Sequence, residues 1–327
     1  MSMLRQQGDR VLWVTPVITL LGFLDTHLLI PVIAIYASSL GAGIGMVGLI
    51  VGIYSIINTP SNVVFGSAIA NYSEGGKQGR SMSLYGMSLA SASLIGYPLS
   101  GLIASRLGLS PLFFFGAILV GLGALLTLTL PAGSIREVAA AEAPGAEGIC
   151  KAKELLTKRG LVPSYVAILA QYFTFGGVVT LLPLHLGRLG MGAFEVGMSL
   201  AAFSTMFVIT QFPSGAISDR VGRLPAMVAG LLCIIVSLAV LPLVSGFWLL
   251  VAIMGLYGTG YGLLFPSVSA LIGDHTSIGE QGLATGIFHA LLTEWVAIGA
   301  PTRTVCRLWS IIVPVGKGAW RLRHGTF

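Results

Sequence analysis

Long runs of apolar residues, separated by short polar stretches, make up most of the chain. Nine runs are long enough to cross the ~30 Å hydrocarbon core of a bilayer as helices. They cover residues 11–36, 44–70, 82–104, 111–131, 161–187, 194–217, 225–243, 247–273 and 283–300. The ten-residue segments of alternating polarity that mark a membrane β-barrel do not occur in the sequence. The pattern predicts an all-α protein that crosses the membrane about nine times, and 283–300 is the weakest of the nine runs.

One long polar stretch, residues 132–160, interrupts this pattern. It is rich in Ala, Gly and Glu, a composition typical of a solvated linker. We therefore expect a bundle of about four spans in 1–131, a linker in 132–160, and a bundle of about five spans in 161–300. The basic tail 301–327 has no assigned structure.

Composition excludes several classes of protein. Hydrophobic residues make up 55% of the chain and charged residues 9%, compared with roughly 25% charged residues in soluble domains. A soluble enzyme, a nucleic-acid-binding domain and a disordered scaffold are excluded on this ground. We also find no phosphate-binding loop, metal-ligand cluster or nucleophile–base set in the sequence, so we expect no enzyme activity, ATP use, cofactor or metal.

Basic residues predict the orientation of the spans. With a cytoplasmic N-terminus, the outer loops hold only Arg106 and Arg188. The inner segments then hold Arg5, Arg10, Lys77, Arg80, Arg136, Lys151, Lys153, Lys158, Arg159, Arg220 and Arg223. Because Lys and Arg concentrate on the cytoplasmic side, the N-terminus and the linker are predicted to be cytoplasmic. The protein itself is expected in the plasma membrane. The basic tail would be an exception if 283–300 crosses the membrane.

The most specific motif lies between the sixth and seventh runs, in Gly215-Ala-Ile-Ser-Asp219-Arg220-Val-Gly222-Arg223. A small residue at a helix end allows a neighbouring helix to approach closely, and Asp219 can pair with an Arg or cap a helix. This run closely resembles the G-x-x-x-D-R-x-G-R loop of the major facilitator superfamily (MFS) of secondary transporters. An ordinary positive-inside turn would explain the arginines but not the Gly and Asp spacing.

A second resemblance lies in the third run, Gly96-Tyr-Pro98-Leu-Ser-Gly101. It is similar to the Gly/Pro motif in the fifth helix of proton-coupled antiporters of that superfamily, with Pro98 displaced by one position and Ser100 in place of a glycine. A face of small residues for helix packing is an equal alternative.

The resemblance has one discontinuity. Val47 to Gly66 is similar to the second helix of the superfamily, whereas the residues from Ser67 to Gly86 resemble the loop that enters its fifth helix. Our hypothesis is that helices three and four of a twelve-helix plan, and also the last helix, are missing. The alternative is a diverged branch of the family.

Polar side chains inside the spans are the candidate site residues, because charges at membrane depth are costly and need a function or a partner. Asp25 is the main candidate for a proton carrier or a counter-ion, and hydrogen bonding to Thr26 or to a neighbouring helix is its structural alternative. Glu294, with His289, forms a second carboxylate site if 283–300 inserts, and is interfacial if it does not. Further candidates for a polar solute site are Tyr54, Asn58, Gln171 and Tyr172.

These features predict a secondary transporter of the MFS type, in which two bundles alternate access to a midplane site. The expected partners are a small solute, protons and the lipid bilayer, and the favoured direction is proton-coupled efflux, as in multidrug antiporters. The alternatives are a metabolite or sugar permease, and a shortened chain that transports nothing and acts as a membrane interaction subunit.

Overall fold

A computed structural model describes residues 2–43, 45–54, 78–129 and 146–276, together with residues 284 and 287. Every regular element in these residues is a helix. The helices are α1 (Ser2–Ser39), α3 (Gln78–Leu107), α4 (Ser110–Thr127), α6 (Ala146–Thr157), α7 (Val162–Arg188), α8 (Ala193–Val221), α9 (Arg223–Val240) and α10 (Phe247–His275), with the 3₁₀ turn η1 (Leu241–Leu243) after α9 and a short helix over Gly45–Tyr54.

Seven helices of the described part are long and apolar enough to cross a membrane. They are parts of α1 and α3, the whole of α4, α7, α8 and α10, and α9 together with η1. They confirm seven of the nine predicted spans. The run 44–70 is described only over Gly45–Tyr54, and the run 283–300 lies outside the described residues apart from Ala284 and Ile287.

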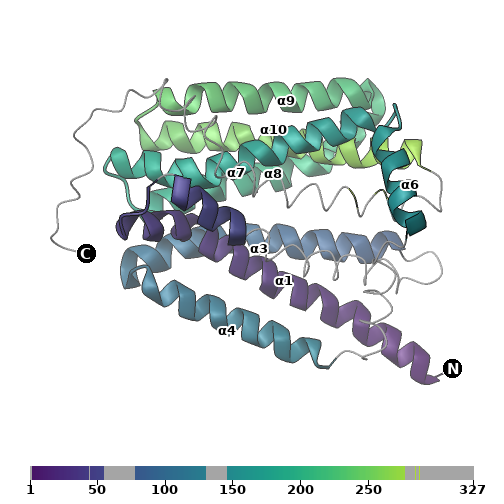
Figure 1. Cartoon of the computed structure of the whole chain (residues 1–327), viewed down its shortest axis with the longest axis horizontal. Helices are drawn as coiled ribbons and strands as arrows, with labels where there is room; N and C mark the ends of the chain where they lie inside the picture. The colour runs from purple at the N-terminus through teal and green to yellow at the C-terminus, as the bar shows by residue number, and fades with distance from the viewer. Residues whose placement is uncertain are drawn as a thin grey trace.

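The long helices run side by side along the long axis of the molecule in two groups (Figure 1). α1 packs against α3 and α4, while α10 packs against α8 and α9. The groups meet where α3 contacts α8 and where α1 contacts α7. The first group lies before the polar stretch in the sequence and the second group lies after it, and we call them the first and the second bundle.

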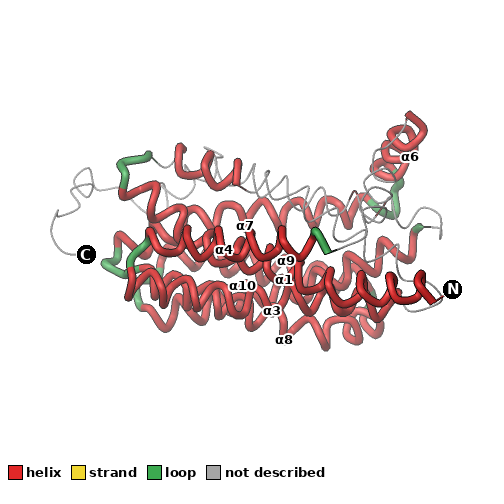
Figure 2. The backbone as a smooth tube through the Cα atoms, turned by 90° about the horizontal axis from the view of Figure 1, so that it is seen from below, coloured by secondary structure: helices red, strands yellow, loops and turns green. Residues whose placement is uncertain are grey.

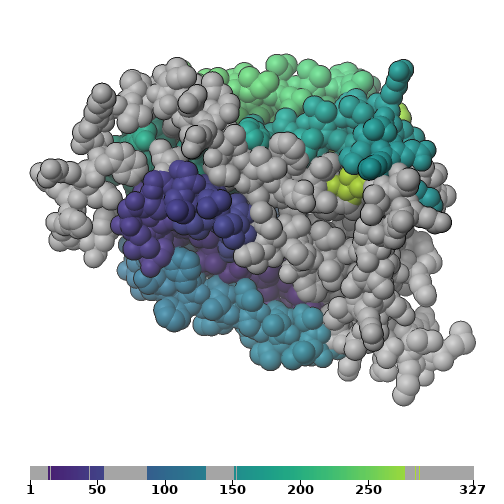
Figure 3. Space-filling view, viewed as in Figure 1, coloured from purple at the N-terminus to yellow at the C-terminus, as the bar shows by residue number. Residues whose placement is uncertain are grey.

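The outer faces of the bundles are apolar. Large side chains such as Phe114 and Leu128 at α4, and Leu232 and Ile235 on α9, are exposed. In the space-filling view α4 and α9 lie at opposite edges of the molecule (Figure 3). Exposed apolar surface on this scale is expected where a protein faces lipid instead of water.

Glycines allow the two bundles to come into backbone contact. A Cβ placed on Gly197 of α8 would lie 2.7 Å from the carbonyl oxygen of Tyr97 and 2.8 Å from Cα of Gly101, both on α3. A Cβ on Gly101 would lie 2.9 Å from the carbonyl oxygen of Ala193. Small residues of this kind bring membrane helices within van der Waals contact, and Gly101 has this position in the packing of α3 against α8.

The polar stretch between the bundles contains a helix that we did not predict. α6 covers its last part and lies across the long axis, at the end of the molecule where α1 begins (Figures 1 and 2). Leu155 of α6 is buried in the core of the second bundle. This part of the linker is therefore docked to the bundle, and the expectation of a solvated linker is wrong at Leu155.

Substituting Gly197 tests the contact between the bundles. We expect Gly197→Ala to lower the midpoint of thermal unfolding of the purified protein, because the new methyl group meets the backbone of α3. The expected loss of stability is about 1–3 kcal/mol. Gly121→Ala is the matched control, because no described atom lies within 4 Å of a Cβ on Gly121 in α4. Equal midpoints for the two variants would contradict the proposed close contact.

Candidate functional site

Asp25 of α1 is a buried carboxylate inside the first bundle, with 6% of its surface exposed. The hydroxyl of Tyr54, from the short Gly45–Tyr54 helix, donates a hydrogen bond of 3.1 Å to its Oδ2. The neighbouring Thr26 instead donates to the carbonyl oxygen of Gly22, at 3.0 Å. Asp25 is therefore hydrogen-bonded to another helix, which is part of the structural alternative considered for it.

The second carboxylate oxygen of Asp25 is confined but unsatisfied. Gly116 of α4 packs directly against Oδ1, and this oxygen has no hydrogen-bond partner in the described residues. The ion pairs found in the described part of the chain do not include Asp25. A buried carboxylate with one donor and no cation is costly to keep charged, and binding a proton or a cation relieves that cost.

His27, two residues further along α1, lies at the contact with α3. Its Nδ1 lies 2.6 Å from the carbonyl oxygen of Phe23, and its ring meets Tyr97 edge-on with centroids 4.8 Å apart. A Cβ on Gly96 would lie 2.7 Å from Cβ of His27. Gly96 therefore lets α1 and α3 pack closely, which is the helix-packing alternative given above for this motif. His27 fills the space that the glycine leaves.

Gln171 of α7 is a second buried polar group, in the other bundle. Its side chain has no exposed surface, and neither amide atom has a hydrogen-bond partner in the described residues. Its backbone carbonyl accepts a hydrogen bond from the hydroxyl of Tyr261 in α10. Tyr257 donates to Tyr261 at 3.2 Å, and its hydroxyl lies 3.0 Å from Oγ1 of Thr174.

Aromatic rings surround this hydrogen-bonded group. The ring of Tyr261 lies 6.0 Å from those of Tyr172 and Phe175 on α7, and 5.1 Å from that of Phe203 on α8. Gln171 and Tyr172 were predicted from the sequence as candidates, whereas Tyr257, Tyr261 and Phe203 were not. The i, i+4 spacing of Tyr257, Tyr261 and Phe265 was the available signal, because it places three rings on one face of a helix.

Tyr97 of α3 lies at the contact between the two bundles. It belongs to the core of the second bundle, yet its ring contacts His27 of the first. Its hydroxyl is buried and has no hydrogen-bond partner in the part of the chain that the structure describes. Tyr97 therefore adds a further buried polar atom without a described partner, at the contact between the bundles.

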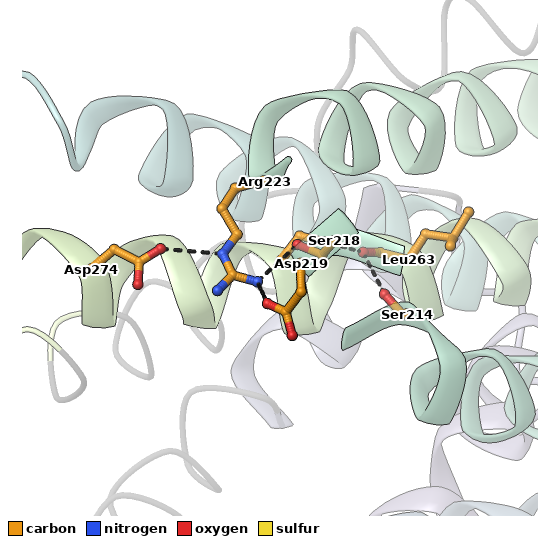
Figure 4. A network of polar contacts seen from close by, with 7 residues as sticks. Ser214, Ser218, Asp219, Arg223, Leu263 and Asp274 are labelled. Carbon is orange, nitrogen blue, oxygen red and sulfur yellow. Dashed lines mark hydrogen bonds and ion pairs between the residues drawn. The ribbon is translucent and has the colours of Figure 1, made fainter. Parts of the chain in front are cut away.

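The loop motif forms a charged clamp at the end of the second bundle (Figure 4). Arg223, the first residue of α9, pairs with Asp219 at the end of α8 and donates from Nε to Oδ2 of Asp274 on α10, at 3.2 Å. It also reaches Oγ of Ser218, at 3.3 Å. Asp219 thus pairs with an Arg, which is one of the two roles expected of it, and the same Arg also binds Asp274, which was not foreseen.

The glycines of the motif differ in role. Gly222 has φ +101°, a conformation that L side chains rarely adopt, and it is the single residue between α8 and α9. No described atom lies within 4 Å of a Cβ on Gly215, so the close approach expected there is not seen. The close contact lies one residue earlier, where Ser214 donates to the carbonyl oxygen of Leu263 at 3.0 Å. Arg220 is exposed.

Three candidates, Asn58, His289 and Glu294, lie outside the described residues, as does most of the discontinuity at 67–86. Pro98 lies inside the continuous helix α3.

Neutralising Arg223 tests the clamp. We expect Arg223→Gln to lower the thermal midpoint slightly at low salt, because α8 and α10 lose their common charged partner. The difference is expected to shrink at about 1 M salt, where the Debye length falls to ~3 Å. Arg220→Gln is the matched control, since Arg220 is in neither of the ion pairs found in the described residues. A loss that is independent of salt would mean that Arg223 acts through packing.

Comparison with known proteins places this architecture in a family. The model of the Major Facilitator Superfamily matches residues 61–301. The chain is 34% identical over 116 residues to the probable L-galactonate transporter of Escherichia coli (strain K12), and 24% identical over 135 residues to the quinolone resistance protein NorA of Staphylococcus aureus (strain Mu50 / ATCC 700699). These matches cover 35% and 41% of the chain, and only 25% and 35% of the two relatives.

Solved structures show the same fold. A bacterial homolog of the human lysosomal transporter Spinster superposes with a TM-score of 0.66 and 15% identity, over 90% of this chain and 81% of the other. A POT family transporter gives a TM-score of 0.60 and 10% identity, over 94% and 92%. The family match, the two helical bundles and the Gly215–Arg223 motif agree, and this multi-pass membrane protein belongs to the Major Facilitator Superfamily.

Proposed function

We propose that the chain is a proton-coupled secondary transporter that exports a small amphipathic solute, with Asp25 as the group that takes up and releases the proton. The observation that carries this proposal is the environment of Asp25. Its carboxylate is buried at a contact of three helices, receives one hydrogen bond from Tyr54, and has no cation beside it in the described residues.

This environment links protonation to helix packing. Oδ1 lies against the backbone of Gly116 in α4, while Oδ2 is held by Tyr54. A charged Asp25 needs water or hydrogen-bond donors, and the described packing supplies only Tyr54. A neutral carboxyl group has no such need. Proton binding therefore favours the closed packing of α1 and α4, and proton release favours an arrangement that admits water. In alternating access, this difference couples the proton gradient to the solute.

The proposed solute contacts lie in the second bundle, around Gln171. An amide that is buried without partners is destabilising by about 1–3 kcal/mol. A polar group of the solute can satisfy this amide, and the rings of Tyr172 and Tyr261 offer flat apolar surface beside it. An amphipathic molecule with a planar apolar part and a hydrogen-bonding group matches both features.

One comparison favours a second candidate, uptake of an organic acid. The probable L-galactonate transporter is the more identical of the two relatives described above. The aromatic rings around Gln171 favour an amphipathic compound with a planar part, and the other relative is named a quinolone resistance protein. The two candidates differ in the solute and in the direction of its movement, and one assay can separate them.

Replacing Asp25 tests the coupling. The purified chain is reconstituted into liposomes with a pH-sensitive dye inside, a proton gradient is imposed, and a quinolone or L-galactonate is added. We expect solute-dependent proton movement for the quinolone, opposite in direction to the solute. Asp25→Asn should reduce it to the background of empty liposomes, because the amide cannot carry a proton.

Two variants serve as controls for this assay. Tyr54→Phe removes the hydrogen bond but keeps the carboxyl group, so proton movement should persist. Glu195→Gln removes a carboxylate at the start of α8, where it accepts a hydrogen bond of 2.8 Å from the amide of Gly192, and should leave transport unchanged. Unchanged coupling in Asp25→Asn would refute the role of Asp25. A response to L-galactonate alone would favour the permease, and no response to either probe would favour a chain that does not transport.

Replacing Gln171 tests the solute contact separately. We expect Gln171→Leu to raise the KM for the solute while the thermal midpoint stays constant or rises, because an unsatisfied buried amide is removed. The matched control on α7 is Thr180→Val, since Thr180 is equally buried and its hydroxyl bonds to the carbonyl oxygen of Gly176, at 2.9 Å. A lower midpoint with an unchanged KM would show that Gln171 has a structural role only.

A further inference from the structure

The apolar runs of the chain contain no strongly basic residue. Lys and Arg occur in none of the nine runs defined from the sequence, whereas Asp25, Glu195 and Glu294 are acidic residues within them. In the described spans the arginines lie in the first or last turn of a helix, as Arg106 does in α3 and Arg188 in α7. The runs therefore offer no permanently positive side chain to a solute that enters between the helices.

Asp25 sets the sign of the charge inside the described spans. It is buried near the middle of the span Pro16–Ser39, whereas Glu195 lies in the first turn of α8. His27 is weakly basic, but it lies two residues further along α1, on another face, and packs against Tyr97. Because charges are weakly screened in a medium of low dielectric constant, a charged Asp25 attracts cations and repels anions without touching them.

The second bundle adds aromatic rings, which also attract cations. The ring of Phe203 on α8 lies 5.4 Å from that of Phe175 on α7 and 5.1 Å from that of Tyr261 on α10, between centroids. Tyr257 lies 5.5 Å from Phe203, and Tyr172 lies 6.0 Å from Tyr261. The face of an aromatic ring carries partial negative charge, so several rings on three helices form a surface that favours an organic cation over an anion.

These rings are divided between a fixed pair of helices and a third helix. α8 and α10 are in backbone contact, because a Cβ on Gly262 would lie 2.8 Å from the carbonyl oxygen of Phe207. In the described residues α7 packs less closely against this pair. Phe175 of α7 also packs against the hydrophobic cluster of the first bundle that contains Leu29, one helical turn after Asp25. The rings of α7 thus adjoin both the aromatic pair and the bundle that holds the carboxylate.

We infer that the solute is a monovalent organic cation with a planar aromatic part, held by the ring faces of α7, α8 and α10 and attracted by the charge of Asp25. This inference rests on the proposed function, to which it adds the sign of the charge of the solute. The unsatisfied amide of Gln171 then bonds to a polar group of the same molecule. An anion in this place would be buried without a positive partner, which is costly.

Three planar compounds of similar shape and different charge test the inference. Aminoacridine is a cation, anthracene carboxamide is neutral and anthracene carboxylate is an anion. Their binding to the purified full chain is measured by equilibrium dialysis in an uncharged detergent and mildly alkaline buffer, with detergent alone as the blank. We expect the Kd of the cation to be about tenfold lower than that of the neutral compound, and the anion to bind more weakly than either.

Two substitutions of equal charge assign the preference to Asp25. Asp25→Asn should remove most of the difference between the cation and the anion, because the amide has no net charge, and should leave the binding of the neutral compound unchanged. Glu195→Gln changes the net charge of the chain by the same amount in the first turn of α8. It should keep the full preference for the cation.

A second pair of substitutions tests the contribution of the rings. Phe203→Leu should weaken the binding of the cation roughly threefold more than that of the neutral compound, because it removes a π face from the centre of the ring cluster. Phe114→Leu is the matched control, since Phe114 on α4 has 73% of its surface exposed. The comparison of the three compounds needs only the unmodified chain, so the inference stays testable if Phe203→Leu does not fold.

Two results would overturn the inference: equal affinities for the three compounds, or tighter binding of the carboxylate. A preference for the cation that survives Asp25→Asn unchanged would overturn the part given to this charge. Because dialysis involves no gradient, the outcome is independent of transport. Preferential binding of aminoacridine without proton movement in liposomes would refute the proposed function and leave the charge preference standing. Proton-coupled export of anthracene carboxylate would support the proposed function and refute the inference.

Discussion

The backbone contact between Gly101 and Gly197 is the constraint on which the arrangement of the bundles depends. Helices inside a bilayer gain little from hiding apolar surface from one another, because lipid tails are equally apolar. Close packing must supply the attraction, and here it occurs where α3 and α8 both lack a side chain. The same approach sets the position of Tyr97, whose carbonyl oxygen lies against Gly197 and whose ring reaches His27.

The two candidate centres have a common physical property. Asp25 and Gln171 are buried in different bundles, and each keeps hydrogen-bonding atoms that nothing in the described residues satisfies. A core selected only for stability would replace such groups by apolar ones, since unsatisfied polar atoms inside a membrane are costly. Buried polar groups that lower the stability of a core in this way are typical of functional positions. Each of the two bundles therefore holds one buried polar side chain that a ligand could satisfy.

The sequence predicted the spans well because length and apolarity decide whether a helix can cross a bilayer. The predicted run 225–243 and the observed α9 with η1 nearly coincide. Helix α6 was missed, because the buried Leu155 belongs to no apolar run long enough to predict a span. Asp25 and Tyr54 were both named, but their hydrogen bond joins residues 29 positions apart on two helices. Neither this contact nor the one between Gly101 and Gly197 follows from local periodicity, because both depend on how whole helices pack.

The connection between α8 and α9 has a mechanical consequence. Gly222 alone separates these helices, so neither can slide along the membrane normal without pulling the other. Arg223 joins the same end to α10. At the far end, α9 continues through η1 and three further residues before α10 begins, which leaves more slack between the helices. The ends of α8, α9 and α10 beside Arg223 are therefore held together, and separation of the three helices is easier at the opposite surface of the membrane.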